Sequence, residues 1–169
     1  MIFYRKKSGY SLVEMIIYVS VLSVVSVLVI NTIFSFAGPY KTLAALRAAE
    51  HSGIDSMERI SRDIRAATSV DTANSTLGSS PGVLTLISTN GVVSTTTKFY
   101  IQNNILRVDV NGVYYGPVTI SSTTITNLVF THIQNTVSSA VKVDMTVVGK
   151  SGTVTKNKTY HSTVILKGI

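Results

Sequence analysis

An apolar run near the N-terminus constrains the fold of this chain more than any other feature. From Leu12 to Ala37 the only ionisable residues are Glu14 and Tyr18. As a helix, this run of about 26 residues would extend roughly 39 Å, enough to cross a hydrocarbon core about 30 Å thick. A charged side chain inside such a helix is costly and usually has a function. Glu14 therefore requires an explanation.

Three interpretations of this segment compete. The simplest is a signal anchor, with the basic residues before the run held in the cytoplasm. The second is a secretory signal peptide cut after Ala37, because Ser35-Phe36-Ala37 has a small-x-small pattern. Its apolar core would be longer than the usual length of about 7–15 residues and would contain Glu14. The third places a cleavage signal before the apolar run, within "KKSG|YSLVE".

The third interpretation rests on a resemblance. The segment resembles the class III leader of type IV pilins and type II secretion pseudopilins. That leader is short and basic and ends in a glycine, and the mature chain begins with a hydrophobic residue and has a glutamate at its fifth position. The matching residues are Arg5, Lys6 and Lys7 as the basic leader residues, Gly9 as its last residue, Tyr10 as the new N-terminus and Glu14 as the glutamate. The resemblance implies that a prepilin peptidase cleaves after Gly9 on the cytoplasmic side and N-methylates Tyr10.

Two departures from the family pattern are visible. Phe or Met is more usual than Tyr at the first mature position. The mid-helix proline of many major pilins is absent, and Asn31 stands near that place. The missing proline argues against a major pilin of the commonest type.

The resemblance also implies a role for Glu14. Cleavage leaves a positive amine on Tyr10, close to the membrane. In a filament, the Glu14 carboxylate of one subunit would neutralise the Tyr10 amine of its neighbour, because either charge alone is costly at low dielectric. The simpler alternative is that Glu14 lies at the interfacial end of the helix and is solvated.

An amphipathic helix is predicted to follow the apolar run. Gly38-Pro39 is expected to bend or locally open the helix. From Tyr40 to about Thr68, apolar residues recur at intervals of three and four, which predicts a helix lying on a globular domain. The apolar positions are Leu43, Leu46, Ile54, Met57, Ile60, Ile64 and Ala67. Glu58–Arg62 and Arg59–Asp63 have the spacing of surface ion pairs.

The C-terminal half of the chain predicts an antiparallel β domain of about seven strands. A polar loop from Asp71 to Gly82 precedes segments rich in Val, Ile, Thr, Tyr and Phe with period-two alternation. The expected strands are Val83–Ser88, Thr96–Gln102, Ile105–Asn111, Val113–Ile120, Thr126–Gln134, Ala140–Val148 and Thr153–Leu166. In Ala140–Val148, one face carries Val141, Val143, Met145 and Val147, and the other carries Lys142, Asp144 and Thr146. Asn103-Asn104, Asn111-Gly112 and Ser151-Gly152 suit tight hairpin turns.

Together these segments predict an α+β fold, with a long N-terminal membrane and amphipathic α-helix packed on a C-terminal antiparallel β-sheet domain in a pilin-like arrangement. The expected organisation is a leader at 1–9, a transmembrane and assembly helix at 10–37, an amphipathic helix at 38–70 and a β domain at 71–169.

The order of segments after the apolar run resembles that of J-type minor pseudopilins and PilW-like minor pilins. The first is "SMERISRDIRAATS" (Ser56 to Ser69). The others are "FYIQNNILRVDVNG" (Phe99 to Gly112), Gly116-Pro117, "ITNLVF" (Ile125 to Phe130), "AVKVDMTVVG" (Ala140 to Gly149) and "TYHSTVILKG" (Thr159 to Gly168). This resemblance implies a minor subunit near a filament tip, where a broad β domain helps to start assembly.

The sequence offers no constellation for catalysis. The chain has no cysteine, and His51, His132 and His161 have no carboxylate partner at metal-ligand spacing. No nucleophile elbow, phosphate loop or dinucleotide motif is present. Asp109 and Asp144 are expected to make surface pairs rather than to bind calcium. We therefore expect neither an enzyme, nor a cofactor, nor a metal site.

A cluster of lysines in the last two predicted strands has two interpretations. Lys142, Lys150, Lys156 and Lys158 would form a basic surface patch for DNA or an anionic glycan. The simpler interpretation is solvation of an edge hairpin, where lysines also discourage aggregation. The net charge does not decide between them. Removal of the leader takes Lys and Arg from 15 to 12 against 8 acids, leaving only +4.

These observations predict a non-enzymatic minor pilin or pseudopilin of a type IV pilus, a competence pilus or a type II secretion pseudopilus. Its partners would be other minor and major pilins or pseudopilins, the prepilin peptidase and the inner-membrane assembly platform. It would lie in the cytoplasmic (inner) membrane with an extracytoplasmic C-terminal domain, and then in a periplasmic or cell-surface filament. The alternative is a membrane-anchored extracytoplasmic module that binds a ligand or DNA without assembling.

Overall fold

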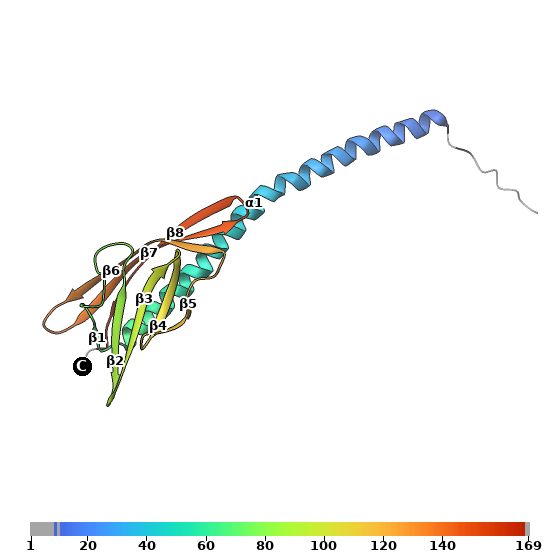
Figure 1. The fold of residues 1–169 in the computed structure, drawn as a ribbon. Helices are drawn as coiled ribbons and strands as arrows, with labels where there is room; N and C mark the ends of the chain where they lie inside the picture. The colour runs from blue at the N-terminus through green and yellow to red at the C-terminus, as the bar shows by residue number, and fades with distance from the viewer. Residues whose placement is uncertain (1–8, 10, 168–169) are drawn as a thin grey trace, which may run out of the picture. The chain divides into compact units, whose positions relative to one another are not determined.

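The computed structural model describes residue 9 and residues 11–167, and the chain forms two compact units, Met1–Tyr40 and Lys41–Ile169. One helix, α1 (Leu12–Ala66), contributes to both units, and every described strand belongs to the second (Figure 1). The two units differ: the helix of the first exposes mainly apolar side chains, whereas the second has a packed core.

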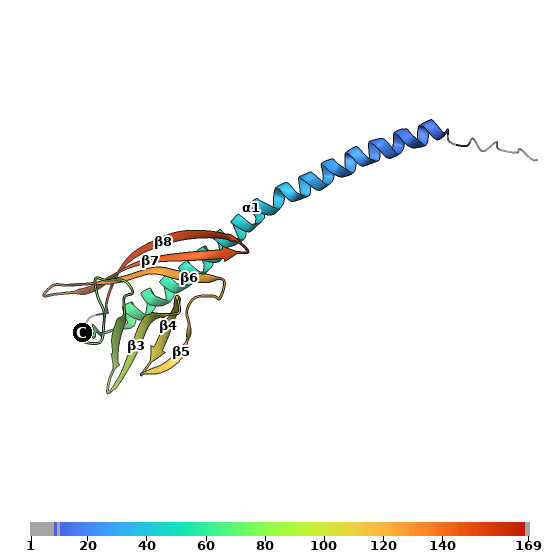
Figure 2. The same ribbon diagram turned by 45° about the horizontal axis from the view of Figure 1, so that its top comes forward.

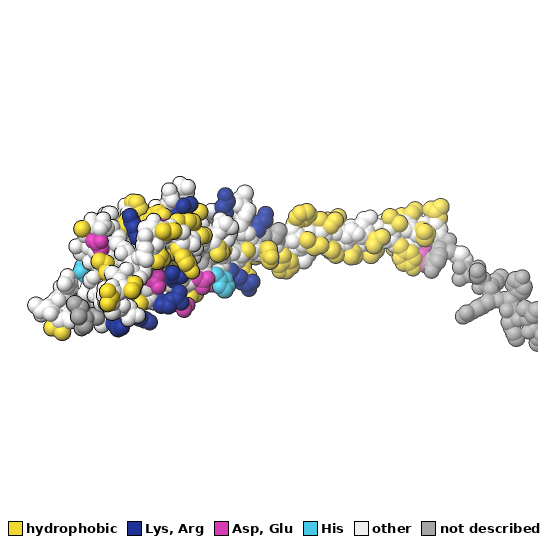
Figure 3. Space-filling view, turned by 60° about the horizontal axis from the view of Figure 1, so that its bottom comes forward, with side chains coloured by type: hydrophobic (Ala, Val, Ile, Leu, Met, Phe, Trp, Pro, Cys, Tyr) yellow, Lys and Arg dark blue, Asp and Glu magenta, His cyan; other side chains and the backbone are white. Residues whose placement is uncertain are grey.

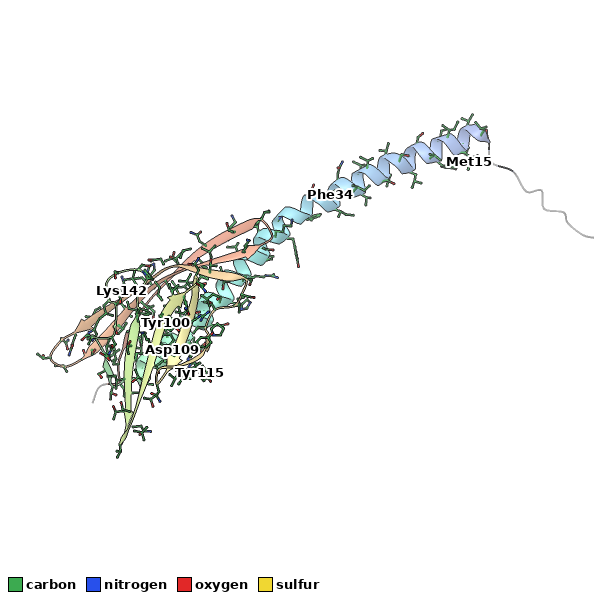
Figure 4. The ribbon with its side chains drawn as sticks, in the orientation of Figure 1. Met15, Phe34, Tyr100, Asp109, Tyr115 and Lys142 are labelled. Atoms are coloured by element: carbon green, nitrogen blue, oxygen red, sulfur yellow. The ribbon has the colours of Figure 1, made fainter. Side chains whose placement is uncertain are left out.

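The helix of the first unit exposes its apolar side chains. An 18-residue window of α1 has a mean hydropathy of 2.5, and none of it is buried. Met15 and Phe34 are 53% and 73% exposed (Figure 4), and Figure 3 shows the apolar side chains of this unit. An unburied apolar helix of this length fits the hydrocarbon core of a bilayer, where its side chains contact lipid chains rather than water.

Five hydroxyl groups of the first unit are satisfied within the helix. Ser20, Ser23 and Ser26 each donate to the backbone carbonyl four residues earlier, at 2.8 Å. Thr32 and Ser35 do the same. Because these groups need no outside partner, they add little to the cost of placing the helix in lipid.

The helix continues across Gly38 and Pro39, so the local opening expected there is not seen. Pro39 has no N–H and cannot donate to the carbonyl of Ser35, four residues earlier. The division between the two units falls directly after this weak point, between Tyr40 and Lys41.

The second unit contains two antiparallel sheets that both pack on residues 41–66 of α1 (Figures 1 and 2). The five-stranded sheet has the order β1-β2-β3-β4-β5, and the three-stranded sheet has the order β6-β7-β8. The strands are β1 (Ser69–Val70), β2 (Leu84–Asn90), β3 (Val93–Gln102), β4 (Ile105–Val110), β5 (Val113–Pro117), β6 (Thr123–Gln134), β7 (Ser139–Ser151) and β8 (Val154–Ile165). The predicted α+β fold is confirmed.

Each of the seven expected strands has a counterpart, but the sequence did not predict the two-residue strand β1 or the division into two sheets. Two expected turns are present: Asn103 and Asn104 have φ of 55° and 60°, and Asn111 and Gly112 have φ of 51° and 77°. The expected turn at Ser151-Gly152 is wrong by one residue. Ser151 pairs with Val154, so Gly152 and Thr153 form that turn.

The sheets bury one alternating face each, as the sequence predicted for β7. Its inward residues are Val141, Val143, Met145 and Val147, all fully buried. They join one core with the large side chains of both sheets and of α1, including Phe99, Phe130, Ile60 and Ile64. Burial of these side chains is the main stabilising contribution in the second unit, at about 1.5–3 kcal/mol for each one.

The buried face of α1 differs in part from the prediction. Met57, Ile60, Ile64 and Ala67 are buried as expected, but Leu43 and Ile54 are 46% and 55% exposed. The N-terminal part of the buried stripe instead consists of small residues: Ala45, Ala49, Ser52, Gly53 and Ser56.

Close backbone approach explains this choice of small residues. A Cβ on Gly149 of β7 would lie 2.0 Å from the carbonyl oxygen of Ala45, and a Cβ on Gly53 would lie 2.2 Å from the Tyr160 ring. Large side chains have no room where the β7–β8 hairpin meets the helix, so Leu43 and Ile54 point elsewhere.

Candidate functional site

Glu14 occupies the first turn of α1 and is partly buried, unlike the apolar residues around it. Its Oε1 accepts a hydrogen bond of 3.0 Å from the Tyr18 hydroxyl. The positive end of the helix dipole also favours a carboxylate in the first turn. Tyr18 was not predicted to take part, although its i,i+4 spacing from Glu14 is the signal that could have found it.

Gly9 lies outside the helix, two residues before Ser11, whose carbonyl accepts the first described helical bond, from the Met15 amide at 3.1 Å. Gly9 is exposed, and a Cβ built on it meets no atom within 4 Å. The other predicted leader residues, Arg5, Lys6 and Lys7, and the predicted methylation site, Tyr10, lie outside the described residues. Gly9 is thus exposed and uncrowded at a position just before the helix.

Comparison with known proteins addresses this same segment. A family model described as the prokaryotic N-terminal methylation motif matches residues 4–30. The chain has a prepilin-type N-terminus, like that of type IV pilins. No curated protein and no solved structure matches the chain.

The prepilin-type motif includes the predicted cleavage site and part of the apolar helix. It covers Gly9, Tyr10 and Glu14, and it continues into the exposed apolar half of α1. Together the motif and the helix indicate a prepilin-type protein anchored in the inner membrane. Such a motif implies processing by a prepilin peptidase and assembly with other pilins.

The four lysines of the predicted basic patch lie on two faces of the three-stranded sheet. Lys142 and Lys150 project from the outer face of β7, opposite in direction to the buried Val141 and Val143. Lys156 and Lys158 pair with Gly149 and Val147, so they project toward the side of the sheet that carries α1. The patch is therefore not one continuous surface in this structure.

Two of these lysines are paired with acids. Lys142 Nζ lies 3.0 Å from Asp144 Oδ2. Lys158 forms an ion pair with Glu50 of α1; their hydrogen bond lowers the pKa of Glu50 and raises the pKa of Lys158. Lys150 and Lys156 make no ion pair within the described chain. A nucleic-acid role for this cluster stays a prediction.

His161 has a carboxylate partner that the spacing of the histidines in the sequence did not reveal. Strand pairing places His161 opposite Asp144, and His161 Nδ1 lies 2.5 Å from Asp144 Oδ1. The hydrogen bond from His161, followed by that from Lys142, lowers the pKa of Asp144 below its usual range. The pair is a cross-strand contact on an exposed sheet face, and no group of three or more metal-ligating side chains occurs among the described residues.

Asp109 has a different partner. Asp109 and Tyr100 lie on the neighbouring strands β4 and β3 (Figure 4), and the Tyr100 hydroxyl donates to Asp109 Oδ1 at 3.1 Å. Burial, together with this hydrogen bond, raises the pKa of Tyr100. Asp109 and Asp144 thus both make surface contacts within the sheets.

Proposed function

We propose that the chain is a minor subunit of a type IV pilus-like filament, cleaved after Gly9 and N-methylated at Tyr10. The observation that carries the proposal is the match of residues 4–30 to the methylation motif, continued by an exposed apolar helix. The filament is a type IV pilus, a competence pilus or a type II secretion pseudopilus. The chain is a structural subunit in this role and carries out no reaction.

The helix assembles by burying its apolar surface against other subunits. In that bundle the Glu14 carboxylate neutralises the Tyr10 amine of a neighbouring subunit, since an unpaired charge would be costly. The Tyr18 hydroxyl supports this role because it donates a hydrogen bond to Glu14. That bond lowers the cost of the carboxylate in the membrane before the subunit is assembled. Residues 1–9 are the leader, and residues 10–37 are the membrane and assembly segment.

The second unit lies outside the cytoplasm and interacts with other minor subunits near the filament tip. The resemblance of its segments to J-type subunits supports this position. Its partners are other minor and major subunits, the prepilin peptidase and the inner-membrane assembly platform.

The experiment is to determine the N-terminus of the protein purified from membranes of its source organism, by mass spectrometry of the N-terminal peptide. We expect the peptide to begin with N-methylated Tyr10, and we expect Gly9→Leu to retain the leader. An intact N-terminus would reject the proposal in favour of a signal anchor. A start at Gly38 would reject it in favour of a secretory signal peptide.

A further inference from the structure

Strand β8 forms one edge of the three-stranded sheet, and its outer side has no neighbouring strand (Figure 2). The register shows which backbone groups are left over. Ser151 and Val154 close a two-residue turn, so they form a hydrogen-bonded pair, and the pairs along the hairpin then alternate. The amides and carbonyls of Thr155, Asn157, Thr159, His161 and Thr163 therefore point away from β7.

Two observed hydrogen bonds confirm this alternation. The Leu166 amide donates to the Ser139 carbonyl of β7, whereas the Lys167 amide points to the opposite side and donates to the Ala67 carbonyl at 3.2 Å. Ala67, the residue that follows α1, thus covers the edge at Lys167. Between Thr155 and Thr163, no backbone partner covers it within the described chain.

The other sheet edges are closed or short. At the β6 edge, Gly78 and Gly82 donate to the Phe130 and Leu128 carbonyls, and Ile125 donates to Asn104. Strand β1 has two residues. Strand β5 has five residues, ends at Pro117 and has an irregular register with β4. Covering and shortening are two usual ways of protecting an edge, and lysines are a third. Strand β8 has 12 residues and no covering segment over most of its length within the described chain, and its two lysines, Lys156 and Lys158, lie near the turn.

A groove of about 540 Å³ runs between this edge and α1. The helix contributes Ile54, Met57, Glu58, Ser61, Arg62 and Arg65, and β8 contributes Tyr160, His161 and Ser162. Ile54 is 55% exposed, which gives the groove an apolar element. Arg62 and Arg65 are exposed and make no ion pair among the described residues. Because the only acid on the helix side of the groove lining is Glu58, that side has a net charge of +1.

A second copy of this chain is a poor occupant. Strand β8 contains Lys156, Lys158 and His161 and no acid. A second β8 strand would therefore bring no acidic side chain to Arg62 and Arg65 of the groove. The lysines lie near the turn, whereas Thr159–Thr163, beside the groove, has none.

We propose that the edge of β8 at Thr159–Thr163 binds an extended, acidic segment of a different protein as a fourth strand. The backbone of that segment pairs with Thr159, His161 and Thr163, and its acidic side chains contact Arg62 and Arg65. Such strand addition takes affinity from main-chain hydrogen bonds and specificity from alternate side chains. This docking site goes beyond the proposed filament role and does not depend on leader cleavage.

The test uses the full chain in detergent micelles and a fluorescent ten-residue peptide in which Glu alternates with Val and Thr. We expect binding with a dissociation constant below about 1 mM. A peptide with Lys in place of Glu, and a Glu peptide N-methylated at alternate amides, are expected not to bind. Peptide addition should slow hydrogen exchange at the amides of Thr159, His161 and Thr163.

Two pairs of variants separate the backbone and charge contributions. Thr163→Pro removes one outward amide without breaking the pairing with β7, and it should bind the Glu peptide about tenfold more weakly than Thr163→Val. Arg62→Gln with Arg65→Gln should weaken binding by about tenfold, and Arg47→Gln, exposed on the same helix outside the groove, by less than about twofold.

Several results would overturn the proposal. These are failure of the Glu peptide to bind at millimolar concentration, equal binding of the Lys peptide, or equal affinity of Thr163→Pro and Thr163→Val. Dimerisation of the unliganded chain that Thr163→Pro abolishes would show that a second copy occupies the edge instead.

Discussion

Replacement of Gly149 by alanine tests the close approach of β7 and α1. The new Cβ would lie 2.0 Å from the Ala45 carbonyl oxygen and 2.8 Å from the Ala49 amide nitrogen. Ordinary contact begins near 3.4 Å, so the two backbones must separate by about 1.4 Å. Overpacking of a core costs about 1–3 kcal/mol. Because both obstacles are backbone atoms of a helix and cannot rotate away, we expect a cost of about 3 kcal/mol.

A destabilisation of about 3 kcal/mol corresponds to a fall in Tm of roughly 10 °C for a unit of this size. Thermal unfolding followed by the near-UV circular dichroism of the tyrosines measures the loss of packing around Tyr100 and Tyr160 of the second unit. Leader cleavage should be unchanged, since Gly149 is remote from residues 4–30 in the sequence and belongs to the other unit.

Gly53→Ala is the matched comparison, because its new Cβ would meet the Tyr160 ring at 2.2 Å rather than backbone. Tyr160→Val should therefore rescue much of the loss in Gly53→Ala. Ala45→Gly should not rescue Gly149→Ala, since the carbonyl oxygen remains. A Tm of Gly149→Ala within about 2 °C of that of the parent chain, or recovery of its stability by Ala45→Gly, would refute a clash between the two backbones.

Three further substitutions test other parts of the chain. Glu14→Val should leave membrane insertion intact and abolish incorporation into filaments, as measured by shear fractionation and immunoblotting; Asn31→Val, a polar-to-apolar control in the same helix, should incorporate normally. The pKa of Asp144 is lowered by its hydrogen bond from His161, so this contribution is present above the unfolded pKa and lost as the pH falls through the folded pKa. Asp144→Asn should thus reduce the unfolding free energy at pH 7 by under about 1 kcal/mol and by less at pH 3, in urea titrations at both pH values; an equal loss would refute the pairing. Asn111 has a φ of 51°, so Asn111→Ala should cost about 1–2 kcal/mol in the same assay and Asn111→Gly less.

Much of the β domain could be predicted because its signals are local. Alternation placed Val141, Val143 and Met145 on the buried face, and Asn103-Asn104 marked a turn with positive φ. The motif of the N-terminal segment is likewise contiguous, so it could be recognised without any tertiary information. The roles of its individual residues remain predictions, because they depend on processing and on other subunits.

Features that depend on tertiary approach could not be predicted in the same way. Apolar periodicity favours large side chains, so Leu43 and Ile54 were expected in the core and Ala45 and Gly53 were not. Small residues are needed at these positions because the β7–β8 hairpin lies close to the backbone of α1, and the sequence does not reveal that contact. A helix face built from Ala, Ser and Gly has no strong hydrophobic signal.

Cross-strand partners depend on the placement of a turn to within one residue. With a turn at Ser151-Gly152, Asp144 would lie opposite Thr159. The actual turn at Gly152-Thr153 moves the register by two residues and brings His161 opposite Asp144. An error of one residue in the turn therefore leaves each side chain on the same face of the sheet but gives it a different cross-strand partner.

The same small-residue contact also determines how β8 can be used. Tyr160 packs against Gly53 and Lys158 pairs with Glu50, so the inward side of β8 is held on the helix. The outward backbone groups from Thr155 to Thr163 cannot turn inward without breaking those contacts, and no element of the described chain covers them. A strand edge held in this way needs little further ordering when a partner binds, which lowers the entropic cost of association. Gly53 thus favours docking at the outer edge of β8 by holding the inward side of that strand on the helix. Gly53→Ala should therefore weaken binding of the acidic peptide as well as destabilise the fold.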